Sequence, residues 1–160
     1  MRIFTTALAL AVLAFTSLSS QAMAEKRSLK LHQEKPELTR IDIGTAGSSN
    51  GDMLAFQAAV TTDNGAKATM YGLLVTVDIA DGEDEFEDRT GQIYFDFGNG
   101  SSLVVAGHSV YKSNAQEMEA SAPQVRAVIG GTGDYIGSTG QVTTTRNADG
   151  SYDHVVELID

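Results

Sequence analysis

The sequence predicts an all-β domain built as an eight-stranded antiparallel β-barrel. Short segments of alternating polar and apolar residues recur along the chain, and turn sequences rich in Gly, Asn and Asp separate them. No segment after the N-terminal leader has a convincing helical period. A meander of eight or nine such strands either stacks into a sandwich or closes into a barrel, and closure is favoured because it removes the unpaired edges.

The first 24 residues have the features of a signal peptide. Arg2 supplies a positive charge, residues 7–15 are an unbroken apolar run, and Ala22-Met23-Ala24 matches a small-x-small cleavage site. The apolar run is too short to span a bilayer as an anchor. We therefore expect an exported protein, secreted or periplasmic, that begins near Glu25 and has no membrane anchor. The absence of cysteine excludes disulfides and thiol chemistry.

Composition limits the partners that the chain can have. A hydrophobic content of 42% is too high for a disordered acidic chain. The formal net charge of −10 disfavours nucleic acid and anionic membrane surfaces as partners. We expect one domain, in which a barrel region of residues 51–160 is joined to the N-terminal strands and loop of residues 25–50. We expect no cofactor.

The expected strands follow one another through recognisable turns. Pro36 separates the first two strands, which suits an edge position. Asn64-Gly65 and Asn99-Gly100 indicate hairpins, since Asn-Gly accepts the positive φ angles of a type I′ turn. A bulge is expected at Gly72 in the long fourth strand. The strands are expected at residues 28–33, 38–43, 52–60, 66–79, 91–97, 101–111, 124–129, 139–146 and 151–159.

Two longer connections are expected between these strands. Residues 81–88 are acidic, but their order does not match a D-x-D-x-D-G calcium loop, so we expect a solvated loop that protects the sheet edge. Residues 112–123 contain Met118 and few other apolar side chains, which indicates a loop with one helical turn. No metal site is expected, because the three histidines lack the spacing of shared ligands.

Residues 128–142 form the most informative part of the sequence, because five glycines occur in it. So many glycines indicate positive φ angles or close approach to another element. The spacing does not match G-x-G-x-x-G, no Lys follows, and no helical pattern begins there, so a corner between two strands is favoured over a nucleotide-binding loop. Tyr135 and Ile136 are expected to pack beneath this corner.

The same segment resembles a known family. Residues 130–137, Gly-Gly-Thr-Gly-Asp-Tyr-Ile-Gly, with Gly140 three positions later, are similar to the G-G-[ST]-G-x-[FY]-x-G-x-x-G segment of allene oxide cyclases, and dirigent proteins carry a related one. Residues 51–56 resemble the family's G-D-x-x-x-F strand, and residues 72–75 and 103–107 fall where two further strands should. The resemblance implies an eight-stranded antiparallel barrel, a homotrimer, and a cavity that orients an apolar molecule during ring closure.

Most of the residues that work in that family are replaced here. Positions where allene oxide cyclases have an Asn, a Cys and a pocket Tyr hold Ala58, Leu74 and Ser109. Tyr111 lies on the same strand face as Ser109 and is a substitute for the missing Tyr. The arginine of dirigent proteins would fall near Thr139, which is not basic. The resemblance therefore implies the shape of the barrel rather than a known chemistry.

Two catalytic candidates remain, Glu34 and Tyr111. Gln33 and Glu34 lie near the expected position of the family's first-strand Glu, and Glu34 would serve as a general acid or base if the barrel buries it. Tyr111 would contribute a phenol inside the barrel.

The strand alternation and the resemblance together place ten residues on the inward face. Either they fill the barrel as a packed core, or they line a pocket for a hydrophobic ligand that a few polar groups orient. The small residues Ala58 and Gly107 favour some empty volume. The ligand-binding candidates are Leu54, Phe56, Ala58, Leu74, Phe95, Val105, Ser109 and Tyr111, and Ile93 and Leu103 share their face.

Two functions follow from this interpretation. The first is an exported small β-barrel that binds a hydrophobic small molecule in its interior. The second is a cofactor-independent cyclase or isomerase, similar to allene oxide cyclases or dirigent proteins, that acts by enforcing the conformation of its substrate with one proton relay. Charged residues that face the cavity would distinguish the two, and the sequence places none there.

Overall fold

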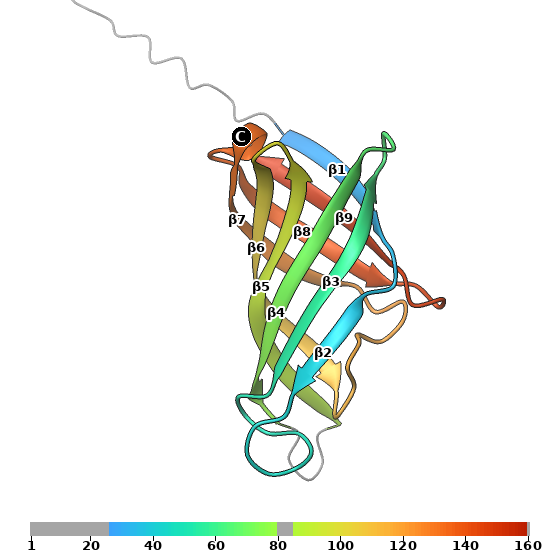
Figure 1. Ribbon diagram of the computed structural model, residues 1–160, viewed down its shortest axis with the longest axis vertical. Helices are drawn as coiled ribbons and strands as arrows, with labels where there is room; N and C mark the ends of the chain where they lie inside the picture. Colours follow the sequence, from blue (N-terminus) through green and yellow to red (C-terminus); the bar gives the residue numbers. More distant parts are fainter. Residues whose placement is uncertain (1–25, 80–84, 160) are drawn as a thin grey trace, which may run out of the picture.

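The computed structural model describes residues 26–79 and 85–159, which form one closed antiparallel sheet (Figure 1). The predicted signal peptide, with its cleavage site at Ala24, lies outside the described residues. The strand order is β1-β9-β8-β7-β6-β5-β4-β3-β2, and an additional pairing of β1 with β3 closes the ring. The strands are β1 (Lys26–Gln33), β2 (Glu37–Ile41), β3 (Met53–Thr62), β4 (Lys67–Asp78), β5 (Phe86–Gly98), β6 (Ser101–Lys112), β7 (Gln124–Thr132), β8 (Thr139–Arg146) and β9 (Tyr152–Ile159).

The strands β1 and β2 are two halves of one interrupted strand. Both pair with β3, with Gln33 opposite Val60 and Leu38 opposite Phe56. Pro36 lies between the two halves, where its missing N–H interrupts no ladder hydrogen bond. Counted in this way, the barrel has eight strands, and the predicted fold class is confirmed. No helix among the described residues is long and apolar enough to cross a membrane.

Strand β4 runs regularly past Gly72, so the bulge expected there is wrong. Gly72 lies opposite Phe56 on one side and Ile93 on the other, in unbroken register. A Cβ atom at position 72 would lie 2.0 Å from a ring carbon of Phe56, so the glycine makes room for that ring. The register shift in this ladder lies instead between Thr76 and Asp78.

The acidic segment is only partly a loop. Residues 81–84 of the predicted loop lie outside the described residues, whereas β5 begins at Phe86 and includes Glu87 and Asp88. Glu87 is buried inside the barrel, so the prediction of a solvated position is wrong for this residue. The reason is that Arg89, two residues further along the same face, supplies an opposite charge in the interior.

Residues 113–123, which we call the strap, cross from β6 to β7 without the helical turn that was expected. In Figure 1 the strap lies beside β2 and the ends of β8 and β9. Ala120 forms an isolated parallel bridge with Arg146, and the Ser121 amide donates to the Arg146 carbonyl at 2.9 Å. Met118, a residue of the strap, has a buried side chain. The strap therefore covers a part of the wall where strand pairing is incomplete.

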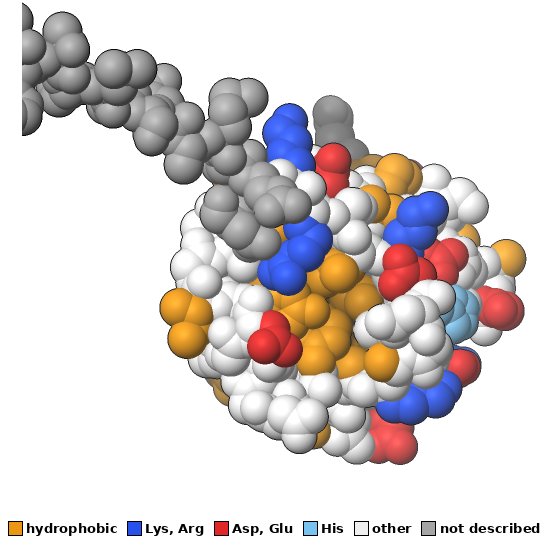
Figure 2. All heavy atoms as spheres, turned by 90° about the horizontal axis from the view of Figure 1, so that it is seen from above, with side chains coloured by type: hydrophobic (Ala, Val, Ile, Leu, Met, Phe, Trp, Pro, Cys, Tyr) orange, Lys and Arg blue, Asp and Glu red, His pale blue; other side chains and the backbone are white. Residues whose placement is uncertain are grey.

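The end of the barrel at the glycine corner is filled with apolar side chains. Figure 2 views this end, with hydrophobic atoms in the middle of the ring and charged groups around it. Tyr135 ends the 3₁₀ turn Gly133–Tyr135 and packs on Phe97, with ring centroids 4.9 Å apart, as expected. Ile136 is 79% exposed, so the prediction that it packs beneath the corner is wrong. The core here contains Leu31, Val60, Met70, Ile93, Phe95, Leu103, Val105, Val128, Val142, Val156 and Leu158.

Candidate functional site

A cavity lies in the other half of the barrel, between this core and the strap. Its volume is about 40 Å³, measured as the space that the centre of a water-sized sphere can reach. That volume holds two or three water molecules. One half of the interior is therefore a packed core, whereas the other half contains a small cavity. The lining consists of Gln33, Pro36, Leu38, Leu54, Phe56, Met70, Leu74, Ile93, Tyr111, Gln116, Met118, Arg126, Thr144, Tyr152 and His154.

The break at Pro36 explains why the cavity lies here. β1 pairs with β9 as far as Gln33 and Tyr152, whereas β2 pairs only with β3. The strap closes the remaining gap through Glu117, whose carboxylate lies 3.1 Å from the Arg146 guanidinium and accepts a 3.4 Å hydrogen bond from the Tyr152 hydroxyl. The mouth of the cavity is thus covered by a loop held by side chains rather than by a strand.

A chain of three buried polar residues forms one wall of the cavity. Nε2 of His154 lies 2.9 Å from Oε1 of Gln33, and Nδ1 lies 3.0 Å from the Thr144 hydroxyl. The amide oxygen only accepts, so Nε2 carries the proton and Thr144 donates to Nδ1. Burial, together with the charge of Arg126, lowers the pKa of His154 to about 3. The imidazole is therefore neutral, and both of its nitrogens are engaged.

Arg126 places a positive charge at the same wall. Arg126 lies in β7 and is only 4% exposed. It is two positions before the buried Val128 and therefore faces the same side of the strand. Its interactions are with the Tyr111 and Tyr152 side chains, and its Nε has no hydrogen-bond partner. Burial lowers the pKa of Arg126, but an arginine remains charged in proteins. The cavity therefore contains a fixed cation.

Tyr111 brings a protonated phenol next to this cation. The residue is 5% exposed and lines the cavity. Burial raises the pKa of its hydroxyl, although the charges of Arg126 and Arg89 oppose that shift. The hydroxyl therefore stays protonated at neutral pH and can donate a hydrogen bond. Together, Arg126 and Tyr111 can bind an oxygen atom that carries negative charge, against walls that are otherwise mostly apolar.

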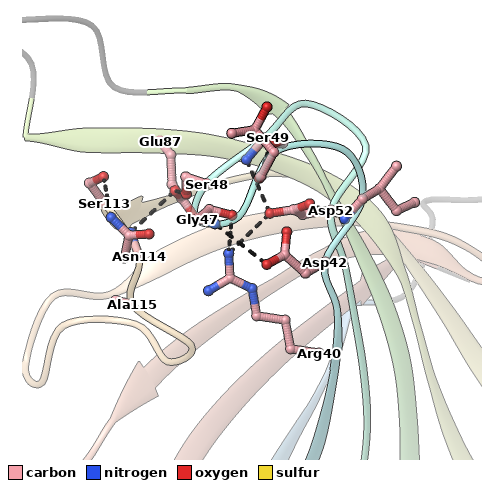
Figure 3. Close-up of polar contacts among 12 residues, drawn as sticks. Arg40, Asp42, Gly47, Ser48, Ser49, Asp52, Glu87, Ser113, Asn114 and Ala115 are labelled. Carbon is pink, nitrogen blue, oxygen red and sulfur yellow. Dashed lines mark hydrogen bonds and ion pairs between the residues drawn. The ribbon is translucent and has the colours of Figure 1, made fainter.

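A second polar cluster closes the end of the barrel below the cavity (Figure 3). Asp52 accepts from the Arg40 guanidinium at 3.0 Å and from the Ile43 amide at 2.8 Å. The hydrogen bond from the Ile43 amide lowers the pKa of the Asp52 carboxyl, and the hydrogen bond and charge of Arg40 lower it further. Glu87 pairs with Arg89 and accepts from the Ser48 hydroxyl. We call these residues the base network, and each of its charges has an opposite partner.

The predicted site residues divide into three groups. Leu54, Phe56, Leu74 and Tyr111 line the cavity. Glu34 is exposed and does not line the cavity. The remaining predicted ligand-binding residues are buried in the interior without lining the cavity: Ala58, Phe95, Val105 and Ser109, the last of which donates to the Arg89 carbonyl at 3.3 Å.

The sequence interpretation missed the polar wall of the cavity. Arg126 was missed because Val125 and Ile129, on the other face of β7, are apolar and suggest the buried face, yet they are 55% and 53% exposed. His154 was not among the candidate site residues, yet it is buried and lines the cavity. The available signal was the alternation of His154 with Val156 and Leu158 in β9.

Comparisons with known proteins agree with the fold. No family profile matches the chain, and no curated protein matches its sequence. Solved structures do match. A pyocyanin demethylase aligns with a TM-score of 0.60 at 17% identity, over 84% of this chain and 99% of that one. A pterocarpan synthase dirigent protein aligns with a TM-score of 0.56 at 14% identity, over 98% of each chain. This chain has the fold of the dirigent and cyclase barrels.

A third solved structure agrees with this fold. It is a Diels-Alderase from Streptomyces koyangensis, which aligns with a TM-score of 0.64 at 13% identity, over 84% of this chain. This chain spans 64% of the length of that enzyme. The resemblance to allene oxide cyclases and dirigent proteins is thus confirmed at the level of the fold, and at these identities the comparisons carry no residue roles.

Proposed function

We propose that this dirigent-like barrel is an exported protein that binds an apolar small molecule in its interior. The observation that carries the proposal is the composition of the cavity, in which a mostly apolar wall faces a small number of buried polar groups. Small-molecule sites usually have this composition, since apolar contacts supply affinity and a few polar groups fix orientation. Leu54, Phe56, Leu74 and Met118 form the apolar part, whereas Tyr111 belongs to the polar part.

Entry of a ligand requires the strap to move. Ligand sites commonly enclose about 300 Å³ or more, which exceeds the present cavity. Met118 is buried against Leu54, Leu74, Tyr111 and Tyr152, so its displacement would enlarge the cavity directly. The strap is held by few contacts at this point, chiefly those of Glu117 with Arg146 and Tyr152. We therefore propose that the ligand replaces the Met118 side chain.

A binding assay with a fluorescent apolar probe tests this proposal. The unmodified protein should enhance the probe's emission saturably, and Leu54→Trp should abolish the enhancement because the indole fills the cavity. The matched control is Leu73→Trp, which adds the same indole on the outer face, where Leu73 is 44% exposed. Equal binding by both variants, or no binding by the unmodified protein, would contradict a ligand site in the interior.

A second function, that of a cofactor-independent cyclase or isomerase, is favoured by the buried Arg126 and Tyr111. A fixed cation beside a phenol stabilises negative charge that develops on a substrate oxygen, while the apolar wall holds a reactive conformation. Barrels of the same fold are named as a cyclase and a Diels-Alderase. Native mass spectrometry of protein recovered from its host, followed by chromatography of any retained compound, separates the two functions. A compound released unchanged indicates binding, and one released as an isomer of the same mass indicates a cyclase.

The same mass measurement tests the proposed export. The mature protein should have the mass of a chain that begins near Glu25, because the cleavage site ends at Ala24. Recovery at the full precursor mass from the membrane fraction alone would contradict it.

A further inference from the structure

Arg126 differs from the other arginines in this half of the barrel. Arg40 pairs with Asp52 at 3.0 Å, Arg89 pairs with Glu87, and Arg146 pairs with Glu117 at 3.1 Å. Arg126 is as deeply buried as Arg89, yet no carboxylate among the described residues lies within ion-pair distance of it. The same interior therefore contains one guanidinium with a matching acid and one without.

An unpaired buried charge is costly for the fold. Transfer of an ion from water into a protein interior costs several kcal/mol even after relaxation, unless an opposite charge and hydrogen bonds compensate it. The Tyr111 phenol is protonated and neutral, so it solvates the cation without neutralising it. His154 is also neutral and its nitrogens are occupied by Gln33 and Thr144. The protein side of the cavity thus leaves the charge of Arg126 uncompensated.

Arg126 lies where a ligand in the cavity could pair with its charge. Its side chain lines the cavity, and its Nε is buried without a hydrogen-bond acceptor. The apolar part of the lining, with Leu54, Leu74 and Met118, continues toward the mouth beneath the strap. A ligand with an anionic oxygen at one end and an apolar body would satisfy both regions at once. A planar carboxylate matches the donor fork of a guanidinium.

We propose that the ligand of this barrel is an apolar monocarboxylic acid whose carboxylate pairs with Arg126 and accepts a hydrogen bond from Tyr111. This proposal rests on the proposed function and specifies its ligand class. The hydrocarbon part lies against Leu54 and Leu74 and takes the place of Met118. The complex then contains a buried ion pair of the kind that Glu87 and Arg89 already form in the base network.

Calorimetric titration with octanoate and 1-octanol, which have the same hydrocarbon chain, tests the proposal. The unmodified protein should bind octanoate at least about tenfold more tightly than 1-octanol, because a charge-assisted bidentate contact replaces a neutral one. Arg126→Met removes the charge at similar length and should abolish this preference without weakening the binding of 1-octanol. The control is Arg27→Met, because Arg27 lies at the other end of the barrel, 4.9 Å from the Tyr135 ring centroid. That variant should keep the preference.

A salt series supplies a measurement that needs no variant. A buried ion pair is screened little, so the preference for octanoate should persist in about 0.5 M NaCl, whereas attraction to exposed lysines would be lost. Equal affinities for octanoate and 1-octanol in the unmodified protein, loss of the preference in salt, or its retention in a folded Arg126→Met protein would each overturn the carboxylate assignment. If neither compound nor the fluorescent probe binds, the proposed function itself is wrong.

Discussion

The guanidinium carbon of Arg89 lies 4.2 Å from the centroid of the Tyr111 ring, so a charge of the base network supports a wall of the cavity. Arg89 is itself held by Glu87 and donates to the Ala115 carbonyl in the strap. The ring of Tyr111 is therefore fixed from below, while its hydroxyl reaches the region of Arg126. This contact links the closed end of the barrel to the candidate site.

Replacing the aromatic ring of Tyr111 with an aliphatic side chain should cost more stability than removing its hydroxyl. Tyr111→Phe keeps the ring beneath the Arg89 guanidinium, whereas Tyr111→Leu removes the cation–π contact and leaves space. A desolvated contact of this kind contributes about 1–2 kcal/mol, and we expect that difference between the two variants in urea denaturation. Equal losses would show that the cation–π contact with Arg89 contributes no stability.

Acid should destabilise the fold through His154. Its pKa is about 3 in the folded protein and near 6.5 when the chain is unfolded, so between these values the unfolded state binds the additional proton. Stability therefore rises with pH across this window, by at most about 1.4 kcal/mol per pH unit from this group. His154→Asn should flatten the pH dependence of the free energy of unfolding between pH 4 and 6.5, measured by denaturant titration.

His32 supplies a control of opposite sign. The hydrogen bond that Nδ1 of His32 donates to the Asp153 carboxylate, at 2.8 Å, raises the pKa of His32. Its contribution to stability is fully present below its unfolded pKa and is lost as the pH rises through the folded pKa. His32→Asn should thus lower stability below about pH 6.5 and leave it unchanged at alkaline pH. A flattened curve from this variant, like that of His154→Asn, would contradict the assignment of the two histidines.

Substitutions at two glycines of the corner should separate the cost of backbone strain from the cost of a steric clash. Gly133 and Gly137 both have positive φ angles, +59° and +84°. A Cβ at Gly133 would lie 2.8 Å from the Gly100 carbonyl oxygen, whereas a Cβ at Gly137 would meet no atom within 4 Å. Gly133→Val should therefore cost more than about 2 kcal/mol, and clearly more than Gly137→Val, which is strained only in its backbone. Thermal melting of both variants measures the difference, and identical melting temperatures would refute it.

Loosening the strap should expose its amides and accelerate ligand exchange. Arg146→Met removes the partner of Glu117 but retains the Arg146 carbonyl that accepts from the Ser121 amide. We expect faster hydrogen exchange across residues 113–123 and faster release of the bound probe, because the strap loses the ion pair that holds Glu117 in place. Lys112→Met, which removes a more exposed ion pair with Glu119, is the matched control. Unchanged exchange in Arg146→Met would show that the strap does not open there.

The fold could be predicted because most strands alternate cleanly and the turns carry Asn-Gly or glycine. The inward face of β3 was predicted from Leu54, Phe56, Ala58 and Val60, and three of these four are buried while Phe56 is partly so. The division between packed core and cavity could not be predicted, since it depends on the gap beside β2. That gap arises from Pro36 and from the course of the strap, which no local pattern encodes.

The polar side of the candidate site could not be predicted for a different reason. In β7 both faces carry apolar residues, so alternation does not show which face is inside. An isolated arginine is usually exposed. Here Arg126 is inside because β6 and β8 place Tyr111 and Thr144 in the same region, and these contacts become visible only once the barrel has closed.

The pairing of β1 with β9 determines when the barrel can close during folding. Strand β1 meets β3 through only three residue pairs, from Leu31 to Gln33, but it meets β9 along its whole length. The ring is therefore completed by joining segments from opposite ends of the described chain, at the greatest loop-closure cost. A chain that stops before Tyr152 would form an open sheet with exposed edges at β1 and β8, which favours aggregation over a smaller barrel. During synthesis, the barrel can close only after its last strand has been made.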